Sequence, residues 1–156
     1  MPAMEARIDA LDGELIGVHR TWLYRGPDGV WRRCDRAMLG RAAGGAVRLA
    51  AAAETLLIGE GIETTLAGMQ ATGLPAWAAL STSGLKTQIL PPIVRELVIL
   101  ADHDVSGAGE RAAYAAADRW LAEGRRVRIA LPPEPGTDIA DVLAGRAYAE
   151  VRDVAA

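Results

Sequence analysis

The stretch ELVILADHDVSG, residues 96–107, decides how this chain is organised. Its apolar residues 97–101 are followed at once by Asp102 and Asp104, with one residue between them, and then by glycine. A short apolar run of this kind predicts a buried strand, and the alanine-rich segment 107–123 predicts the helix that follows it. The strand therefore carries two acidic side chains to its own carboxyl end.

The same alternation of strand and helix extends on both sides of this stretch. Apolar strands are predicted at 55–60, 75–80, 96–101 and 126–133. Helices are predicted between them, and a terminal pair of helices is predicted over 136–155. Four short apolar strands separated by helices favour an α/β fold, with a four-stranded parallel sheet that is flanked by helices.

The chain before the first of these strands has a different pattern, with short alternating segments joined by turns. Its Asp-Gly dipeptides at 12–13 and 28–29 are typical of hairpins, because glycine readily takes the positive φ angles that such turns need. We therefore expect a small antiparallel β meander over residues 1–53, followed by a second unit over residues 54–156.

The composition excludes several classes of protein. The 156 residues carry a formal net charge of −3. A protein that holds nucleic acid by phosphate contacts alone is normally basic, so any such contact here must come from a local patch, a metal ion or a partner. A single cysteine, Cys34, excludes an internal disulfide and a zinc site of paired cysteines. The sequence has no secretory signal pattern and no apolar stretch of bilayer length, which predicts a cytoplasmic protein without a membrane segment.

Acidic residues follow three of the predicted strands, at the edge of the sheet where ligands usually bind. These residues are Glu60, Asp102, Asp104, Asp138 and Asp141. Two unit charges about 5 Å apart repel by about 3 kcal/mol at an effective dielectric constant of about 20, so the close pair needs compensation. Mg²⁺ prefers carboxylate oxygens. The sequence therefore predicts a site for Mg²⁺ or Mn²⁺, to which the last two acids contribute less.

The alternative interpretation of these acids is structural. Aspartates that follow a strand often form turns or cap the next helix, and Ser106 is a further candidate cap for the helix after the third strand. Asp138 and Asp141 are equally open to a capping role. Glu60 favours the metal interpretation, because a glutamate that closes an apolar strand has no local structural role.

Three segments, taken in order, resemble the Toprim domain. They are LLIGEGIETTLAG at 56–68, WAALSTSGL at 77–85 and LVILADHDVSGAGERAA at 97–113. This domain is shared by type IA and type II topoisomerases, bacterial-type DNA primases and some nucleases. The segment PPEPGTDIADVL at 132–143 resembles the acidic stretch after the last strand in primases. The meander resembles the segment that precedes the Toprim domain in phage and plasmid primases and primase-helicases.

The resemblance implies Mg²⁺-dependent nucleotidyl or phosphoryl transfer on nucleic acid, with RNA primer synthesis by a DNA primase-like catalytic core as the first interpretation. It implies that Glu60 acts as a general acid or base or joins the metal site. It implies that Asp102 and Asp104 hold the metal. Asp138, with Asp141 beside it, corresponds to a further acid of primases.

Four more positions are candidate contacts to phosphate or nucleic acid: Lys86, Arg111, Gly84 and Gly107. The two cations would touch phosphate, and the glycines would permit a close backbone approach. DNA and nucleotides are the partners that follow. Primases often carry an aspartate where Thr64 stands, and the sequence has no zinc ribbon or P-loop, so a helicase or zinc-ribbon domain would be supplied elsewhere.

Other interpretations remain open on the sequence. The chain is alternatively a non-catalytic Toprim module that binds nucleic acid or a partner protein, with Trp22, Tyr24 and Trp31 as candidates for stacking on bases. A Toprim nuclease is a further alternative. The segment GAGERA at 107–112 mimics a dinucleotide-binding fingerprint, and the two aspartates mimic an aspartate-nucleophile phosphatase, but neither motif has its usual sequence context.

Overall fold

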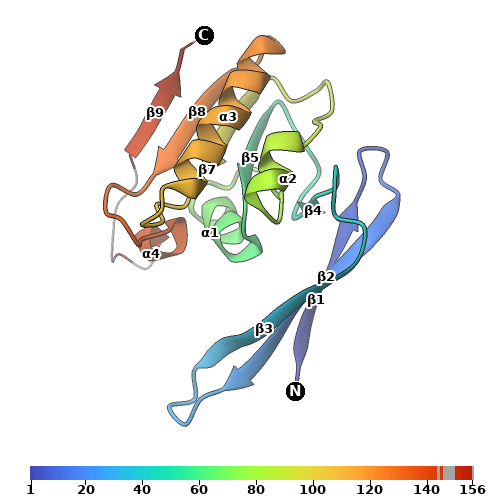
Figure 1. Cartoon of the computed structure of the whole chain (residues 1–156), viewed down its shortest axis with the longest axis vertical. Helices are drawn as coiled ribbons and strands as arrows, with labels where there is room; N and C mark the ends of the chain where they lie inside the picture. The colour runs from blue at the N-terminus through green and yellow to red at the C-terminus, as the bar shows by residue number, and fades with distance from the viewer. Residues whose placement is uncertain (144, 146–149, 156) are drawn as a thin grey trace.

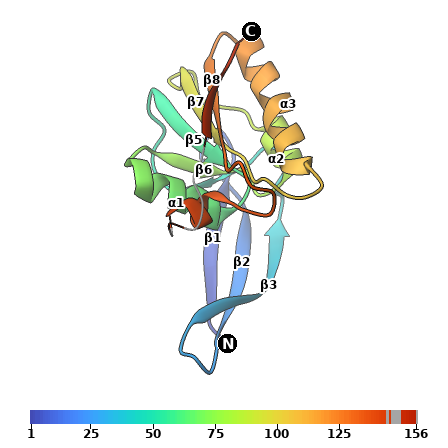
Figure 2. The same ribbon diagram turned by 90° about the vertical axis from the view of Figure 1, so that its left-hand side faces the viewer.

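The computed structural model describes residues 1–143, 145 and 150–155, and it contains two β-sheets (Figure 1). The first is a three-stranded antiparallel sheet of β1 (Ala3–Asp9), β2 (Leu15–Arg25) and β3 (Trp31–Gly40) in that order. This sheet, called the arm below, projects from the rest of the molecule (Figures 1 and 2). Both Asp-Gly dipeptides lie in the turns between its strands, and their glycines have φ angles of 89° and 79°. The predicted meander is confirmed.

The second sheet has six strands in the order β4-β6-β5-β7-β8-β9. These strands are β4 (Val47–Arg48), β5 (Thr55–Gly59), β6 (Ala76–Ala78), β7 (Glu96–Leu100), β8 (Arg126–Leu131) and β9 (Glu150–Val154). The four predicted strands β6, β5, β7 and β8 run parallel, as expected. The two outer strands, β4 and β9, are antiparallel additions at the edges.

The prediction of a second terminal helix is wrong. The first helix of the predicted pair is present as α4 (Ile139–Leu143), but the end of the segment forms the strand β9. Residues 144 and 146–149 of this segment lie outside the described residues. Strand β9 pairs with β8 from Val127 opposite Val154 to Leu131 opposite Glu150. This pairing gives hydrogen-bond partners to the edge of β8, and such tertiary pairing overrides a local helical pattern.

Helices cover both faces of the six-stranded sheet. One face packs against α2 (Thr82–Thr87) and α3 (Ala108–Ala122), and the other packs against α1 (Ile62–Thr72) and α4 (Figure 2). Alternate residues of the central strands divide between two apolar clusters, because successive side chains of a strand point to opposite faces. In β7, Leu97 and Ile99 join the α2/α3 cluster, whereas Val98 and Leu100 join the α1/α4 cluster.

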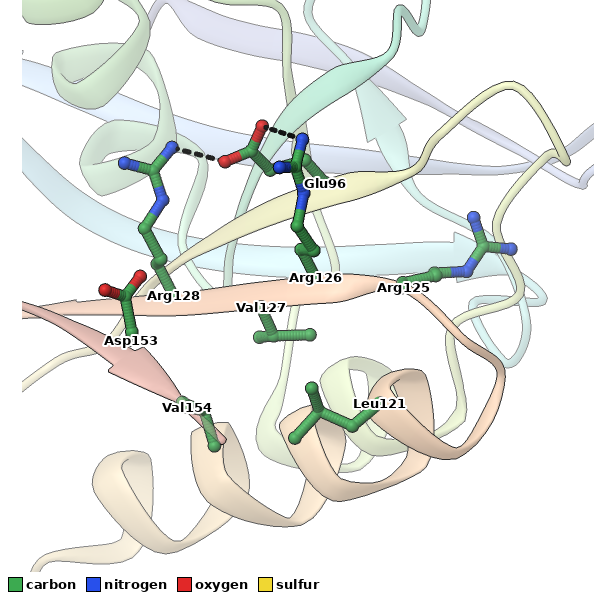
Figure 3. A pocket seen from close by; sticks show the side chains of 8 residues that line it. All are labelled: Glu96, Leu121, Arg125, Arg126, Val127, Arg128, Asp153 and Val154. Carbon is green, nitrogen blue, oxygen red and sulfur yellow. Dashed lines mark hydrogen bonds and ion pairs between the residues drawn. The ribbon is translucent and has the colours of Figure 1, made fainter. Parts of the chain in front are cut away.

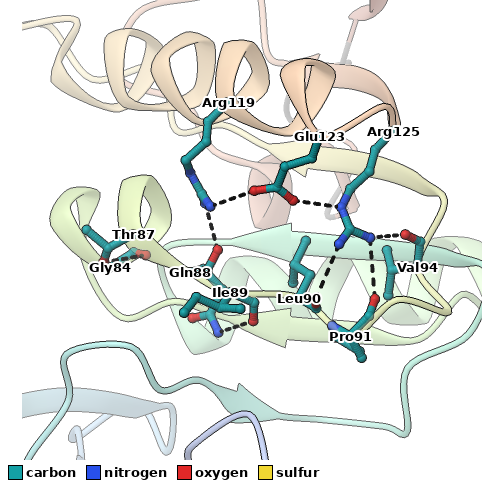
Figure 4. Close-up of polar contacts among 10 residues, drawn as sticks. All are labelled: Gly84, Thr87, Gln88, Ile89, Leu90, Pro91, Val94, Arg119, Glu123 and Arg125. Atoms are coloured by element: carbon teal, nitrogen blue, oxygen red, sulfur yellow. Dashed lines mark hydrogen bonds and ion pairs between the residues drawn. The ribbon is translucent and has the colours of Figure 1, made fainter.

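Two arginines fix the end of α3 to the connection that enters β7 (Figure 4). Arg119 donates a 2.6 Å hydrogen bond to the carbonyl of Gln88, and Arg125 donates to carbonyl oxygens in the 90–94 segment. Glu123 accepts from both guanidinium groups. Because β7 leads directly into Asp102, this network holds in place the strand that carries the predicted site. None of the described helices is long and apolar enough to span a membrane.

Candidate metal centre at the carboxyl edge of the sheet

Glu60 and Asp102 follow two strands that are neighbours in the sheet. Strand β5 ends at Gly59 and β7 ends at Leu100, and these two residues are opposite each other in the parallel register. The carboxyl ends of adjacent parallel strands lie at the same edge of a sheet, so Glu60 and Asp102 lie together at one edge, which is called the rim below. Both residues are partly buried there.

Thr64, in the first turn of α1, contacts the carboxylate of Asp102. Its hydroxyl Oγ1 donates a hydrogen bond of 3.4 Å to Oδ1 of Asp102, and the residue is only 5% exposed. The sequence identified Thr64 only as a departure from the primase pattern. The sequence feature that could have indicated this contact is the position of Thr64, four residues after Glu60 and in the first turn of the helix that follows β5.

Asp104 caps helix α3. Its carboxylate accepts hydrogen bonds from the backbone N–H of Ala108 at 3.1 Å and of Gly109 at 2.9 Å, and from the hydroxyl of Ser106 at 2.6 Å. The Ser106 hydroxyl, followed by the Gly109 N–H, lowers the pKa of Asp104 to about 2. The capping interpretation thus applies to Asp104, whereas the predicted cap Ser106 acts chiefly by donating to it, besides a 3.3 Å contact with the Ala108 N–H.

His103 connects the end of β7 to the segment after β8. Its ring Nδ1 lies 2.6 Å from the carbonyl oxygen of Pro132, and its backbone forms an antiparallel bridge with Thr137. This bridge places Asp138 near Asp102, and the charge of Asp138 contributes to the raised pKa of Asp102. The acidic segment after the fourth predicted strand therefore joins the same rim.

Asp138 and Asp141 also cap a helix. The backbone N–H of Asp138 donates to Oδ2 of Asp141 at 3.1 Å, and the backbone N–H of Asp141 donates to Oδ1 of Asp138 at 2.9 Å. This reciprocal arrangement is that of a capping box at the start of α4. Both residues therefore have the capping role that the sequence left open. The charge of Asp138 nevertheless acts on Asp102 at the rim.

The pKa values of Glu60 and Asp102 are both raised, which indicates that the acids of the rim lie close to one another. Burial raises the pKa of Glu60, and the charges of Asp102 and Asp104 raise it further, while Lys86 acts in the opposite direction. Burial likewise raises the pKa of Asp102, with contributions from the charges of Asp138 and Asp104, and the hydrogen bond from Thr64 opposes the shift. Glu60 and Asp102 are thus held close to like charge without a matching number of cations.

The four candidate phosphate contacts lie in different settings. Lys86 is an exposed residue of α2 whose charge acts on Glu60, and Arg111 is exposed but donates to the carbonyl of Ser106 at 2.9 Å. Gly107 has a positive φ of 68° and precedes α3. A Cβ at Gly84 would lie 2.0 Å from the carbonyl oxygen of Ala79, so this glycine permits α2 to approach the chain that leaves β6. The close approach at Gly84 is therefore within the protein.

The donor set fits a hard divalent cation. Among the described residues, no group of three or more His, Cys, Asp or Glu side chains lies close enough to hold a metal ion as the side chains stand. Mg²⁺ does not need such a group, because it commonly binds one or two carboxylates and completes its shell with water and substrate phosphates. Asp102 and Glu60 supply carboxylate oxygens with incompletely compensated charge. Asp104 keeps acceptor capacity beyond its cap, because a carboxylate has about four lone-pair sites.

A pocket at the opposite end of the strands contrasts with this rim (Figure 3). It has a volume of about 340 Å³ and lies beside the beginnings of β7 and β8. Glu96 forms ion pairs with both Arg126, at 3.3 Å, and Arg128, at 2.8 Å, while the side chain of Arg125 extends away from these three residues (Figure 3). The acid Glu96 of this pocket is therefore compensated by cations, unlike the acids of the rim.

The Asp102→Asn variant is expected to melt at a temperature a few degrees above the wild type at pH 7 in EDTA. Because the folded state raises the pKa of Asp102, it binds the proton more tightly than the unfolded chain does, and stability is lost as the pH rises from the unfolded pKa through the folded one. The gain should shrink below about pH 4, where both states are protonated. Asp104→Ala is the control with the opposite sign, because it removes a cap, and its melting temperature should fall. An Asp102→Asn variant that melts below the wild type at pH 7 would contradict this account of the rim.

The chain belongs to the Toprim domain family, whose model matches residues 55–148. Residues 1–49 match a second family, a domain of unknown function named DUF7146. No curated protein matches the chain.

Solved primase structures share the fold. A DNA primase domain from Pseudomonas aeruginosa is 18% identical with a TM-score of 0.56, and the match covers 93% of this chain and 47% of that one. The DnaG catalytic core is 18% identical with a TM-score of 0.59, over 93% of this chain and 49% of that one. The DnaG primase catalytic domain bound to ssDNA is 18% identical with a TM-score of 0.57, over 94% and 52%. The chain spans about half the length of these primase chains, and at this identity the likeness concerns the fold.

Proposed function

We propose that this protein carries out Mg²⁺-dependent nucleotidyl or phosphoryl transfer on nucleic acid, as the catalytic core of a DNA primase of the phage or plasmid type that makes RNA primers. The observation that supports this most is the rim itself. Glu60 and Asp102 are partly buried, burial and the charges of neighbouring acids raise the pKa of each, and they form no ion pair within 4.0 Å among the described residues. Such charge crowding costs stability, and it is typical of functional sites.

The residues of the rim have distinct proposed roles. Asp102 and Asp104 would hold Mg²⁺ or Mn²⁺, which when bound neutralises phosphate charge and lowers the pKa of an attacking hydroxyl. Glu60, whose pKa is raised by burial and by the neighbouring aspartates, would act as the general acid or base. Asp138 and Asp141 would support the site from their cap.

The surroundings of the site follow from the same proposal. Lys86 is the proposed contact to substrate phosphate nearest to Glu60, with Arg111 at the start of α3 as a second. The proposed partners are DNA and nucleotides in the cytoplasm, and a helicase or zinc-ribbon domain supplied elsewhere. Residues 1–53 would form a unit distinct from the Toprim unit at 54–156.

One set of observations favours a second candidate, a non-catalytic Toprim module. Asp104 caps α3, Asp138 and Asp141 cap each other's backbone at α4, and the described residues form no three-ligand group. In that case the acids would stabilise helix ends, and the protein would bind nucleic acid or a partner protein without turning it over.

A direct assay separates the candidates. The protein is incubated with single-stranded DNA and labelled ribonucleoside triphosphates in Mg²⁺, in Mn²⁺ or in EDTA. We expect short RNA products that depend on the metal. Metal-dependent nicking of the DNA without RNA synthesis would identify a nuclease instead. The absence of both reactions, together with retained DNA binding, would identify the non-catalytic module.

A further inference from the structure

The charges of the two parts of the chain have opposite signs. Residues 1–53 contain eight arginines and six acids, a net charge of +2, whereas residues 54–156 contain nine cations and fourteen acids, a net charge of −5. The cations of the first part are concentrated in β2, β3 and their connections, on the arm that projects from the acidic remainder (Figure 1). A basic arm beside an acidic rim is an electrostatic feature that the catalytic site does not explain.

The strand register separates the arginines of the arm into two faces. Arg36 is opposite Thr21, Arg33 is opposite Leu23, and Trp31 is opposite Arg25. Cross-strand partners lie on the same side of a sheet, and alternate residues of a strand share a side. The inner face of the arm is therefore defined by Arg25, Trp31, Arg33 and Arg36.

The outer face of the arm carries the remaining cations and aromatic rings of these strands. It is defined by Arg20, Trp22, Tyr24 and Arg32, which occupy the alternate positions.

The inner face leads to the acidic rim. Arg33 lies 3.7 Å from Glu63 of α1, and Arg36 lines a cleft of about 340 Å³ together with His19, Met38 and Leu80. The backbone N–H of Leu80 in turn donates a 2.8 Å hydrogen bond to the carbonyl of Glu60. The inner face therefore reaches Leu80, a half-buried residue whose backbone contacts the glutamate of the site.

The two faces differ in how far their cations are neutralised. On the outer face, Arg20 pairs with Glu5 at 2.7 Å and Arg32 pairs with Asp28 at 2.5 Å. On the inner face, Arg25 donates only to the carbonyl of Gly29. Within the described part of the chain, the guanidinium groups of Arg25 and Arg36 form no ion pair with an acidic side chain within 4.0 Å. The free positive charge of the arm is therefore concentrated on the inner face.

An exposed aromatic ring lies at the outer end of this face. Trp31 is 54% exposed and stands opposite Arg25 at the tip of the arm. Aromatic side chains that are interleaved with cations form stacking platforms for unpaired bases, and the cations follow the phosphates. The distance along β2 from Arg25 to Thr21 is about 13 Å, which corresponds to roughly four stacked nucleotides.

We propose that the inner face of the arm binds single-stranded nucleic acid and directs it to the acidic rim. This proposal gives a role to the segment that matches a domain of unknown function, and it rests on the proposed function and extends it by naming where the substrate strand is held. Free arginine charge and an exposed indole favour a single strand over an acidic protein partner, because the indole has no role in pairing with carboxylates. Binding is independent of the metal, so the two proposals can fail separately.

The test compares two variants of equal charge. Binding of a fluorescent oligothymidylate to the full chain is followed by anisotropy in EDTA, across a series of salt concentrations. Arg25→Ala/Arg36→Ala should weaken binding at least tenfold and lower the salt slope by about 1.4, because each phosphate contact to a single strand contributes about 0.7. Arg20→Ala/Arg32→Ala removes the same charge from the outer face and should leave affinity within about twofold. Trp31→Ala should weaken binding by about fivefold or more.

The outcomes are decisive because the substituted residues are exposed, and thermal melts verify that each variant is folded. Loss of binding by the inner-face variants alone supports the proposal. Equal loss from both double variants, no loss from either, or preferential binding of duplex DNA would overturn it. Strand binding that is lost in the inner-face variant while the wild type makes no RNA would retain this proposal and reject the catalytic one.

Discussion

The Glu60→Gln variant is expected to lose about 10²- to 10⁴-fold in the rate of Mg²⁺-dependent nucleotide transfer, which is the usual contribution of a general acid or base. Burial and the neighbouring aspartates raise the pKa of Glu60, so that its carboxyl group holds a proton more tightly than an ordinary glutamate does. Glutamine keeps the shape of the side chain and one acceptor oxygen but cannot exchange the proton. The rate of primer formation on single-stranded DNA is the quantity to measure.

Glu54→Gln is the matched control for this variant. Glu54 is exposed and immediately precedes β5, at the end of the strand opposite to Glu60, so its substitution removes the same charge away from the rim. We expect Glu54→Gln to keep the wild-type rate within about twofold of its value, a margin of less than about 0.5 kcal/mol. If the two variants were equally active, Glu60 would have no part in the chemistry.

The largest effect on stability is expected from Trp120→Ala, which should lower the free energy of unfolding by about 3–5 kcal/mol. Trp120 is completely buried in the cluster between α3 and the sheet, together with Leu97, Ile99 and Ile129. Removing the indole leaves a cavity that the surrounding strands cannot fill. Urea denaturation of the two proteins measures the difference.

Trp120→Phe separates the loss of volume from the loss of the indole nitrogen. Within the described part of the chain, Nε1 of Trp120 is buried without a hydrogen-bond partner, so its removal relieves an unsatisfied donor. Phenylalanine should therefore cost about 1.5 kcal/mol or less, because most of the ring volume is kept. A loss below about 1 kcal/mol for Trp120→Ala would show that this cluster does not hold the sheet and α3 together as described.

The parallel sheet and the arm could be predicted from the sequence because their signals are local. Apolar runs such as 55–60 and 126–133 have the length of buried strands, and the Asp-Gly dipeptides specify hairpins. Strand β9 could not be predicted in this way, because its conformation depends on pairing with β8 rather than on its own residues. The same holds for β4, which joins β6 instead of the arm.

The acids of the rim could be named from the sequence, but their contacts could not. The choice between cap and metal ligand for Asp104 depends on how α3 meets the end of β7, and the structure places the first N–H groups of α3 on this carboxylate. The role of His103 in attaching the segment of Asp138 depends on a bridge between distant parts of the chain. The contact of Arg33 with Glu63 likewise requires the orientation of the arm, which no local pattern encodes.

The central claim is that Asp102, with Glu60 beside it, takes up a divalent cation. Crystals of the wild type grown with Mn²⁺ and measured at a wavelength where manganese scatters anomalously test this most directly. The account predicts an anomalous peak at coordination distance from an oxygen of Asp102, on the side of Glu60. The absence of a peak at the rim in saturating Mn²⁺, with Asp104 still capping α3, would contradict it.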